Sequence, residues 1–178
     1  VQERPSETKI VDCLPEGIVQ IPPSKSISHR ALICAALAGE SAVTNLGFSE
    51  DVRATLQCLQ AMGAVFTEQD NAVKICKPVT SPVAERVLDC GESGSTLRFL
   101  VPLALAFGVP LRFTGQGRLL ERPLTEYLQL LTEKGGNFHR EAEFIAVSGK
   151  LQAGVFALSG QISSQFVTGL LLALPLLE

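Results

Sequence analysis

Apolar residues recur at helical spacing in two stretches of the chain, and a glycine follows each stretch. Within residues 51–62 and 124–134 the apolar positions fall three or four residues apart, which predicts helices with one buried face. Gly63 and Gly135 stand where helices commonly end, because glycine adopts a left-handed conformation there without steric cost. The two stretches therefore predict a matched pair of amphipathic helices.

Two further stretches, 26–38 and 95–107, are apolar over most of their length and predict longer helices, each preceded by a polar loop rich in serine and glycine. Short apolar runs between the helices predict strands. Asp70 and Asn71 supply turn residues for a hairpin. The predicted strands lie at 17–21, 42–46, 65–68, 72–76, 87–89, 111–114, 137–140 and 144–147.

The chain also matches itself. Two blocks recur in the same order, at offsets of 68 and 72 residues, and each half then follows the pattern β-α-β-α-β-β. A third copy begins with a strand at 154–158 and a helix at 163–174. We therefore expect an α/β fold with two complete units and the start of a third. The matched blocks are Arg30–Leu37 with Arg98–Leu105, and Leu56–Leu59 with Leu128–Leu131.

Composition fits a globular domain and excludes some classes of partner. Of the 178 residues, 46% are hydrophobic and 19% are charged, which argues against disorder. The net charge of −3 provides no field that would attract nucleic acid or an anionic membrane. The apolar stretch 99–111 is interrupted by proline and glycine and is shorter than the roughly 20 residues that span a bilayer. Any anionic ligand must therefore be held by local groups.

The cysteines indicate a reducing compartment. Five are present, an odd number, and none forms a CxxC pair. Cys34 and Cys58 fall within apolar helical patterns and are predicted to be small core residues. We therefore expect a cytoplasmic protein without a disulfide framework or a zinc site.

Three polar loops precede equivalent helices, and each is a candidate anion site. Helix N-termini expose unpaired N–H groups and carry about half a positive charge. Serine hydroxyls add donors, and Lys25 and Arg30 add full charges. For any single loop, helix capping explains the serines as well. Because three such loops occur at equivalent positions, with cations in two of them, we expect an anion site. The loops span 23–30, 90–98 and 159–165.

A fourth polar segment, 115–123, joins a predicted strand to the second amphipathic helix. Arg118 and Arg122 lie in it, and arginine offers paired donors to carboxylate or phosphate. Pro123 suits the first turn of the following helix. For either arginine alone, an exposed surface residue is an equally simple interpretation.

These segments resemble the EPSP synthase family. The similar segments are PSKSISHRALICAALAGES, SEDVRATLQCLQAMGA, GESGSTLRFL, GQGRLLERPL and QISSQFVTGLLLALPL, in family order and spacing. The resemblance implies a fold of two inside-out α/β domains, each with three β-α-β-α-β-β units. Since family proteins are much longer, we expect this chain to be the N-terminal portion. The resemblance further implies that residues 1–16 belong to the second domain and that residues 17–178 form the substrate-binding domain.

The resemblance implies transfer of the enolpyruvyl group from phosphoenolpyruvate to the 5-hydroxyl of shikimate 3-phosphate, without metal or organic cofactor. It implies a monomeric full-length protein whose partners are these two substrates, with no role for nucleic acid or membrane. Lys25 would contact both substrates and is the catalytic candidate. The shikimate 3-phosphate residues would be Lys25, Ser26, Arg30, Ser163, Ser164 and Gln165. The phosphoenolpyruvate residues would be Lys25, Gly94, Arg122 and Gln165.

Some positions depart from the family's common residues. Glu92 and Phe99 stand where asparagine and proline are common, and His29 replaces a common asparagine. Glu92 would repel a phosphate or carboxylate unless a cation such as Lys25 or Arg122 pairs with it. Asp51 resembles a family acidic residue near the lysine but also suits the first turn of a helix, so it is not placed in the site.

Three alternatives stay open. A non-catalytic fragment would bind shikimate 3-phosphate and turn nothing over, and we expect the isolated chain to be inactive. UDP-N-acetylglucosamine enolpyruvyl transferase shares the fold but carries lysine-asparagine in the first loop and a cysteine in the segment equivalent to 115–123. This chain has Lys25-Ser26 in the first loop and no cysteine in residues 115–123. A phosphate-cyclising enzyme of related fold would bind nucleotide, yet the chain has no GxxxxGK[ST] loop.

Overall fold

The computed structural model describes residues 18, 21–80, 86–159, 161 and 163–177, and these form a mixed α/β fold. Its helices are α1 (Lys25–Ala38), α2 (Glu50–Ala61), α3 (Gly94–Phe107), α4 (Thr125–Glu133), α5 (Ser164–Ala173) and the 3-10 helix η1 (Leu174–Leu176). Its strands are β1 (Ser41–Val43), β2 (Val65–Gln69), β3 (Ala72–Lys77), β4 (Arg86–Asp89), β5 (Leu111–Thr114), β6 (Gly136–Arg140) and β7 (Ile145–Gly149).

The strands form two sheets with related pairing. The first has the order β1-β3-β2 and is antiparallel throughout. The second has the order β4-β5-β7-β6, with β4 and β5 parallel and the other pairs antiparallel. By their order along the chain, β1, β2 and β3 correspond to β5, β6 and β7. The first sheet has the order β1-β3-β2, and the corresponding strands of the second sheet have the same order, β5-β7-β6.

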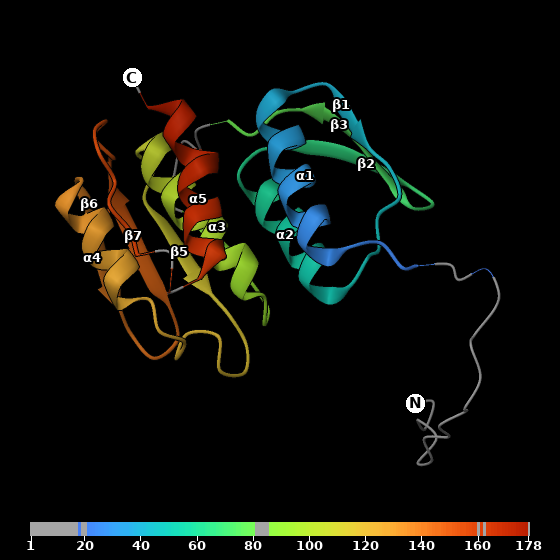
Figure 1. Cartoon of the computed structure of the whole chain (residues 1–178). Coiled ribbons are helices and arrows are strands. Elements are labelled where there is room, and N and C mark those ends of the chain that lie inside the picture. Colours follow the sequence, from blue (N-terminus) through green and yellow to red (C-terminus); the bar gives the residue numbers. More distant parts are fainter. Residues whose placement is uncertain (1–17, 19–20, 81–85, 160, 162, 178) are drawn as a thin grey trace, which may run out of the picture.

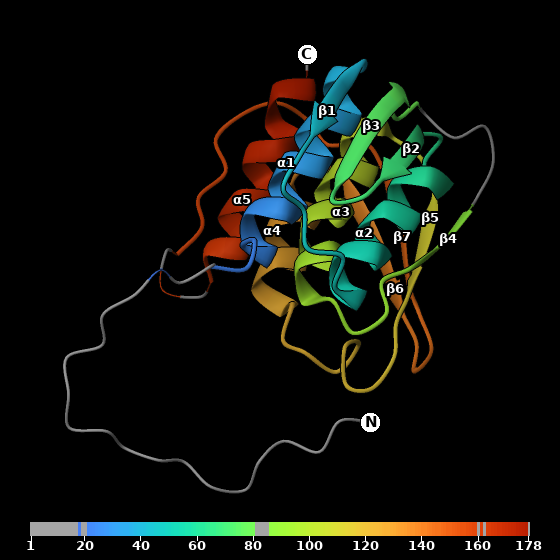
Figure 2. The same ribbon diagram turned by 90° about the vertical axis from the view of Figure 1, so that its right-hand side faces the viewer.

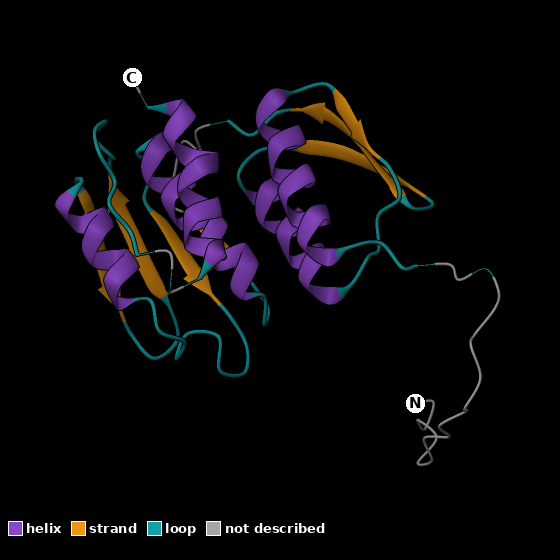
Figure 3. Cartoon of the chain, viewed as in Figure 1, coloured by secondary structure: helices purple, strands orange, loops and turns teal. Residues whose placement is uncertain are grey.

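The two sheets lie on opposite sides of the molecule, and α1, α2, α3 and α5 occupy the space between them (Figures 1 and 3). Figure 2 shows the β1-β3-β2 sheet in front of α1 and α2. Alternation along β3 fits this position, because Val73 and Ile75 are fully buried while Lys74 and Cys76 are exposed. The sheets thus cover a central layer of helices.

Helix positions follow the sequence pattern closely. Each of the five predicted α-helices is confirmed, with ends within a residue or two of those expected. Gly63 and Gly135 both have φ of 99°, a left-handed conformation that side chains other than glycine rarely adopt. None of the helices within the described residues is long and apolar enough to cross a membrane.

Two predicted strands differ from the structure. Residues 154–158 form no strand, because no described strand lies beside them to supply the hydrogen bonds that β5 supplies to β4. The strand expected at 42–46 ends at Val43, and Asn45 has φ of 56°, outside the strand region. The strand expected at 17–21 lies mostly outside the described residues, and the segment 1–16 lies wholly outside them.

One of the two cysteines predicted to be in the core is not there. Cys58 is buried in the face of α2 that packs on β4, and its thiol lies 3.2 Å from the carbonyl oxygen of Asp89. Cys34 is exposed, because the buried side chains of α1 lie on its other faces. The prediction for Cys34 was wrong since residues 31–38 of α1 are all apolar and give no contrast between the inner and outer faces of the helix.

A proline inside α3 is compensated by a tyrosine of α4. Pro102 has no N–H, so the carbonyl of Arg98, four residues earlier, lacks its usual helical donor. The hydroxyl of Tyr127 donates a hydrogen bond to that carbonyl at 3.1 Å. Tyr127 is 1% exposed and its ring lies against that of Phe166, and burial raises the pKa of its hydroxyl well above its usual value. A side chain therefore replaces the backbone donor and ties α4 to the middle of α3.

Replacing Tyr127 by phenylalanine should lower the free energy of unfolding by about 1–3 kcal/mol, because a buried carbonyl loses its donor. Urea denaturation measures the change. In a Pro102→Ala background the alanine N–H can bond to the Arg98 carbonyl, so Tyr127→Phe should cost clearly less there. An equal cost in both backgrounds would show that Tyr127 does not compensate for the proline.

Candidate functional site

The starts of α1, α3 and α5 lie at the same end of the molecule, the lower end in Figure 1. A serine caps each start: Ser24, Ser93 and Ser163 accept hydrogen bonds from backbone N–H groups at 3.4, 3.2 and 3.2 Å. The capping interpretation is therefore confirmed for all three loops. It leaves an anion site open, because a hydroxyl that accepts one hydrogen bond can still donate its own proton.

The first helix start carries two cations held in different ways. The ammonium of Lys25 forms an ion pair with Asp51 of α2 at 2.6 Å, and its side chain remains 58% exposed. The guanidinium of Arg30 donates to the carbonyl of Ser26 at 2.8 Å and to the hydroxyl of Thr168 at 3.1 Å. Arg30 thus joins the start of α1 to α5, while Lys25 faces solvent beside a carboxylate.

Asp51 belongs to this cluster, although the sequence analysis did not place it in the site. It occupies the first turn of α2, as expected, and from there its carboxylate reaches Lys25. A carboxylate at 2.6 Å from the ammonium fixes its position. Asp51 can therefore both stabilise the start of α2 and pair with Lys25.

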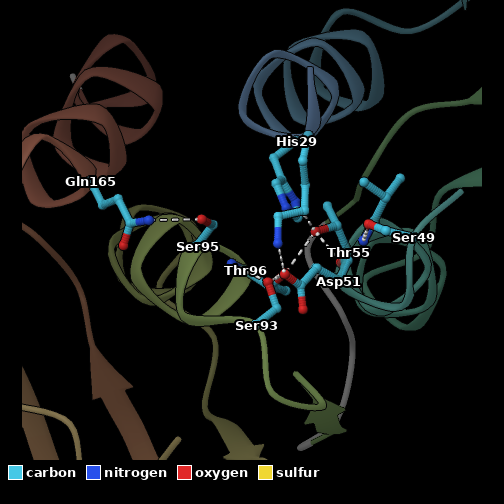
Figure 4. Close-up of polar contacts among 10 residues, drawn as sticks. His29, Ser49, Asp51, Thr55, Ser93, Ser95, Thr96 and Gln165 are labelled. Atoms are coloured by element: carbon cyan, nitrogen blue, oxygen red, sulfur yellow. Dashed lines mark hydrogen bonds and ion pairs between the residues drawn. The ribbon is translucent and has the colours of Figure 1, made fainter. Parts of the chain in front are cut away.

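The starts of α3 and α5 are joined by the side-chain amide of Gln165. Its nitrogen donates to the hydroxyl of Ser95 at 2.9 Å (Figure 4), and its oxygen accepts from the Arg98 guanidinium at 2.6 Å. Ser163 and Ser164 precede it, Ser163 as the cap and Ser164 as an exposed residue. Gln165 is therefore fixed between two helices.

Gly94, the first residue of α3, lies against two guanidinium groups. A Cβ at this position would come within 2.6 Å of an Nη atom of Arg122 and within 2.7 Å of one of Arg98. Arg122 belongs to the predicted site, and Arg98 does not. The internal repeat could have identified Arg98, since it occupies the position in α3 that Arg30 occupies in α1. Any larger residue in place of Gly94 would displace these groups.

A buried chain of hydrogen bonds connects α1, α2 and α3 behind this surface (Figure 4). His29 Nδ1 lies 2.7 Å from the Thr55 hydroxyl, which lies 2.7 Å from the Thr96 hydroxyl. Thr96 in turn donates to the cap hydroxyl of Ser93 at 2.7 Å. The Thr55 hydroxyl also donates to the carbonyl of Asp51 at 3.3 Å, which ties the chain to the first turn of α2. The chain ends at the cap beside Gly94.

His29 is therefore a structural residue. It is 1% exposed, and burial lowers its pKa to about 4, with the nearby charges of Lys25 and Arg30 acting in the same direction against Asp51. Its ring meets Phe99 edge-on, with 6.5 Å between ring centroids. Two departures from the family's common residues thus pack against each other in the core.

Glu92 and Arg118 do not join the cationic cluster. Among the described residues Glu92 forms no ion pair with Lys25 or Arg122, and it lines a hollow of about 370 Å³ beside the site. That hollow is also lined by Glu50, Asp51 and Asp89, so its charge disfavours an anionic ligand. Arg118 is exposed and pairs with Glu121 at 3.0 Å.

The structure thus gathers the predicted residues at one end of three helices, together with Asp51 and Arg98. Over the part of the chain that is described, no group of three or more His, Cys, Asp and Glu residues is placed to hold a metal ion. The cluster is suited to bind a small molecule with phosphate or carboxylate groups, because helix N-termini, hydroxyls and guanidiniums all favour negative charge.

The low pKa of His29 predicts a loss of stability in mild acid. Between pH 6.5 and pH 4 the unfolded chain binds a proton on this ring and the folded chain does not, so stability falls as pH falls. At about 1.4 kcal/mol per pH unit, the loss reaches about 3 kcal/mol at pH 4. Urea denaturation at several pH values should show that His29→Asn removes this part of the dependence.

His139 provides the matched control. It is exposed in β6 and bonds to Glu141 at 2.8 Å, so His139→Asn should leave the dependence close to that of the unsubstituted chain. Equal slopes for the two variants would show that His29 is not the group responsible.

Comparisons with known proteins agree with this geometry. A family model for EPSP synthase (3-phosphoshikimate 1-carboxyvinyltransferase) matches residues 14–178. A 3-phosphoshikimate 1-carboxyvinyltransferase of Clostridium kluyveri is 46% identical over 92% of this chain and 39% of its own length. That of Clostridium beijerinckii is 44% identical over 91% of this chain and 40% of its own length.

A solved structure shows the same relation. An EPSP synthase of Acinetobacter baumannii superposes with a TM-score of 0.75 at 27% identity, over 88% of this chain and 37% of that one. The chain therefore spans about two fifths of the length of the relatives it matches. On the family match and these identities, the chain belongs to the EPSP synthase family.

Proposed function

We propose that this chain supplies the substrate-binding helix starts of an enzyme that transfers the enolpyruvyl group from phosphoenolpyruvate to shikimate 3-phosphate. The observation that carries the proposal is the gathering of Lys25, Arg30, Arg98 and Arg122 at one end of parallel helices. Both substrates carry a phosphate and a carboxylate. A cationic surface of this kind lowers the free energy of both bound anions.

Shikimate 3-phosphate would bind between the starts of α1 and α5. Arg30 supports this assignment, because its guanidinium already spans the two helices through Ser26 and Thr168. Lys25 and Ser26 would contribute an ammonium and a hydroxyl from one side, and Ser163, Ser164 and Gln165 would contribute donors from the other. The exposure of Ser26 and Ser164 leaves both hydroxyls accessible to a ligand.

Phosphoenolpyruvate would bind at the start of α3. The backbone N–H of Gly94 and the guanidinium of Arg122 lie together there, and Gln165 lies beside them through its bond to Ser95. Lys25 would contact both substrates. Its partner Asp51 holds the ammonium in place and would have to share it with an incoming anion.

The finer architecture is also a proposal. The common order of pairing in the two sheets supports a duplicated β-α-β-α-β-β unit, and sheets outside helices support an inside-out domain over residues 17–178. Residues 1–16 would belong to a second domain of the longer relatives. We expect the isolated chain to bind substrates without turnover, since it spans about two fifths of the length of those relatives.

Calorimetric titration tests this assignment. Shikimate 3-phosphate should bind the chain, and Lys25→Ala should weaken that binding at least tenfold, or about 1.4 kcal/mol, because one charge contact is lost. Lys74→Ala removes an equal charge from the exposed face of β3 and should change the affinity less than twofold. In a full-length relative, the equivalent lysine substitution should abolish activity.

Two results would contradict the proposal. One is equal affinity in the Lys25 and Lys74 variants, which would exclude the first loop from the site. The other is binding of UDP-N-acetylglucosamine in preference to shikimate 3-phosphate, which would favour the related transferase of that substrate.

A further inference from the structure

The guanidinium of Arg98 lies in an environment that does not balance its charge. In the described part of the chain it forms no ion pair with a carboxylate, and its Nη1 donates to the neutral amide oxygen of Gln165. Its Nε is buried and has no hydrogen-bond partner. Buried donors are normally satisfied, so an unpaired charged donor marks a position where a partner is absent.

A second cation makes this imbalance larger. The Nη1 atoms of Arg98 and Arg122 both lie within 3 Å of the position that a Cβ on Gly94 would take, so the two guanidiniums are neighbours. Burial and the charge of Arg122 both lower the pKa of Arg98 from its ordinary value. An anion placed between two adjacent guanidiniums at a helix N-terminus would reduce the repulsion between their charges.

Structural contacts hold Arg98 in this position. Its guanidinium lies over the ring of Phe166, 5.2 Å from the centroid, and its carbonyl accepts the Tyr127 hydroxyl bond. These contacts fix both ends of the residue, so the guanidinium is oriented before any ligand arrives. Preorganisation of this kind increases affinity because little side-chain freedom is lost on binding.

From these contacts we propose that Arg98 is a further binding residue of the phosphoenolpyruvate site. Its guanidinium faces the same anionic group as Arg122, and its bond to Gln165 positions that amide toward the ligand. The inference rests on the proposed function, and it adds a residue that the sequence analysis did not assign. The site would then hold its anion between two guanidiniums and the N–H of Gly94.

A purely structural role is the competing interpretation, because Arg98 also joins α3 to α5. The two roles differ in what they predict. A structural role would change stability and the affinity for both substrates alike. A role in the phosphoenolpyruvate site would change the affinity for that substrate more than the affinity for shikimate 3-phosphate.

The test is an NMR titration of the 178-residue chain, followed through the Gly94 amide. The probes are phosphoenolpyruvate, inorganic phosphate and pyruvate, with shikimate 3-phosphate titrated separately. Arg98→Gln should weaken phosphoenolpyruvate binding at least tenfold and shikimate 3-phosphate binding less than threefold. Arg118→Gln removes the same charge from an exposed arginine and should change either affinity less than twofold. Comparing phosphate with pyruvate shows which anionic group the arginines hold.

Several results would overturn the proposal. One is an Arg98→Gln variant that binds phosphoenolpyruvate as Arg118→Gln does, and another is an equal loss for both substrates, which would leave Arg98 a structural residue. If Arg98→Gln does not fold, Arg98→Lys is measured instead, because lysine keeps the positive charge and lacks the paired N–H donors of the guanidinium. Unchanged phosphoenolpyruvate affinity in this variant overturns the proposal, and a threefold or larger loss of affinity supports it. If the unsubstituted chain binds neither substrate, the proposed function fails as well, a result distinct from failure of Arg98 alone.

Discussion

The structure depends on packing three helices side by side with their positive ends together. Each N-terminus carries about half a positive charge, so gathering α1, α3 and α5 in one direction costs electrostatic free energy. Three capping serines reduce this cost by satisfying backbone N–H groups. The remaining field, increased by the guanidiniums of Arg30, Arg98 and Arg122, favours an anionic ligand. Fold and ligand class are thus linked through one constraint.

Polar side chains hold these helix starts in register. The chain from His29 through Thr55 and Thr96 to Ser93 joins three helices, and the amide of Gln165 joins α3 to α5. Both connections are directional, whereas apolar packing alone tolerates small sliding of one helix along another. A shift of α1 against α3 would move Lys25 relative to Gly94. The hydrogen bonds therefore set the geometry in which two substrates could meet.

Much of this could be predicted from the sequence because it is local. Helical spacing and serine caps depend on neighbours in the chain, and they gave five helices and three helix starts within a residue or two. The prediction of a strand at 154–158 was wrong because strand formation is not local: a strand needs a partner strand, and the sequence of residues 154–158 does not specify one. The prediction that Cys34 is buried was wrong because residues 31–38 of α1 are all apolar, so the sequence does not show which face of this half of the helix is buried.

In the site, too, local features could be predicted from the sequence, and contacts between distant residues could not. Motifs identified Lys25, Arg30 and Arg122, yet Asp51 and Arg98 enter it through contacts between elements that are distant in sequence. The repeat, which pairs Arg98 with Arg30, carried a signal for one of them, and the family resemblance, which has an acidic residue near the lysine, carried a signal for the other. The most direct measurement is an NMR titration with shikimate 3-phosphate that follows every assigned backbone amide. Binding at the helix starts should concentrate the shifts at the first turns of α1, α3 and α5, whereas shifts confined to the sheets, or none at these three turns, would contradict binding there.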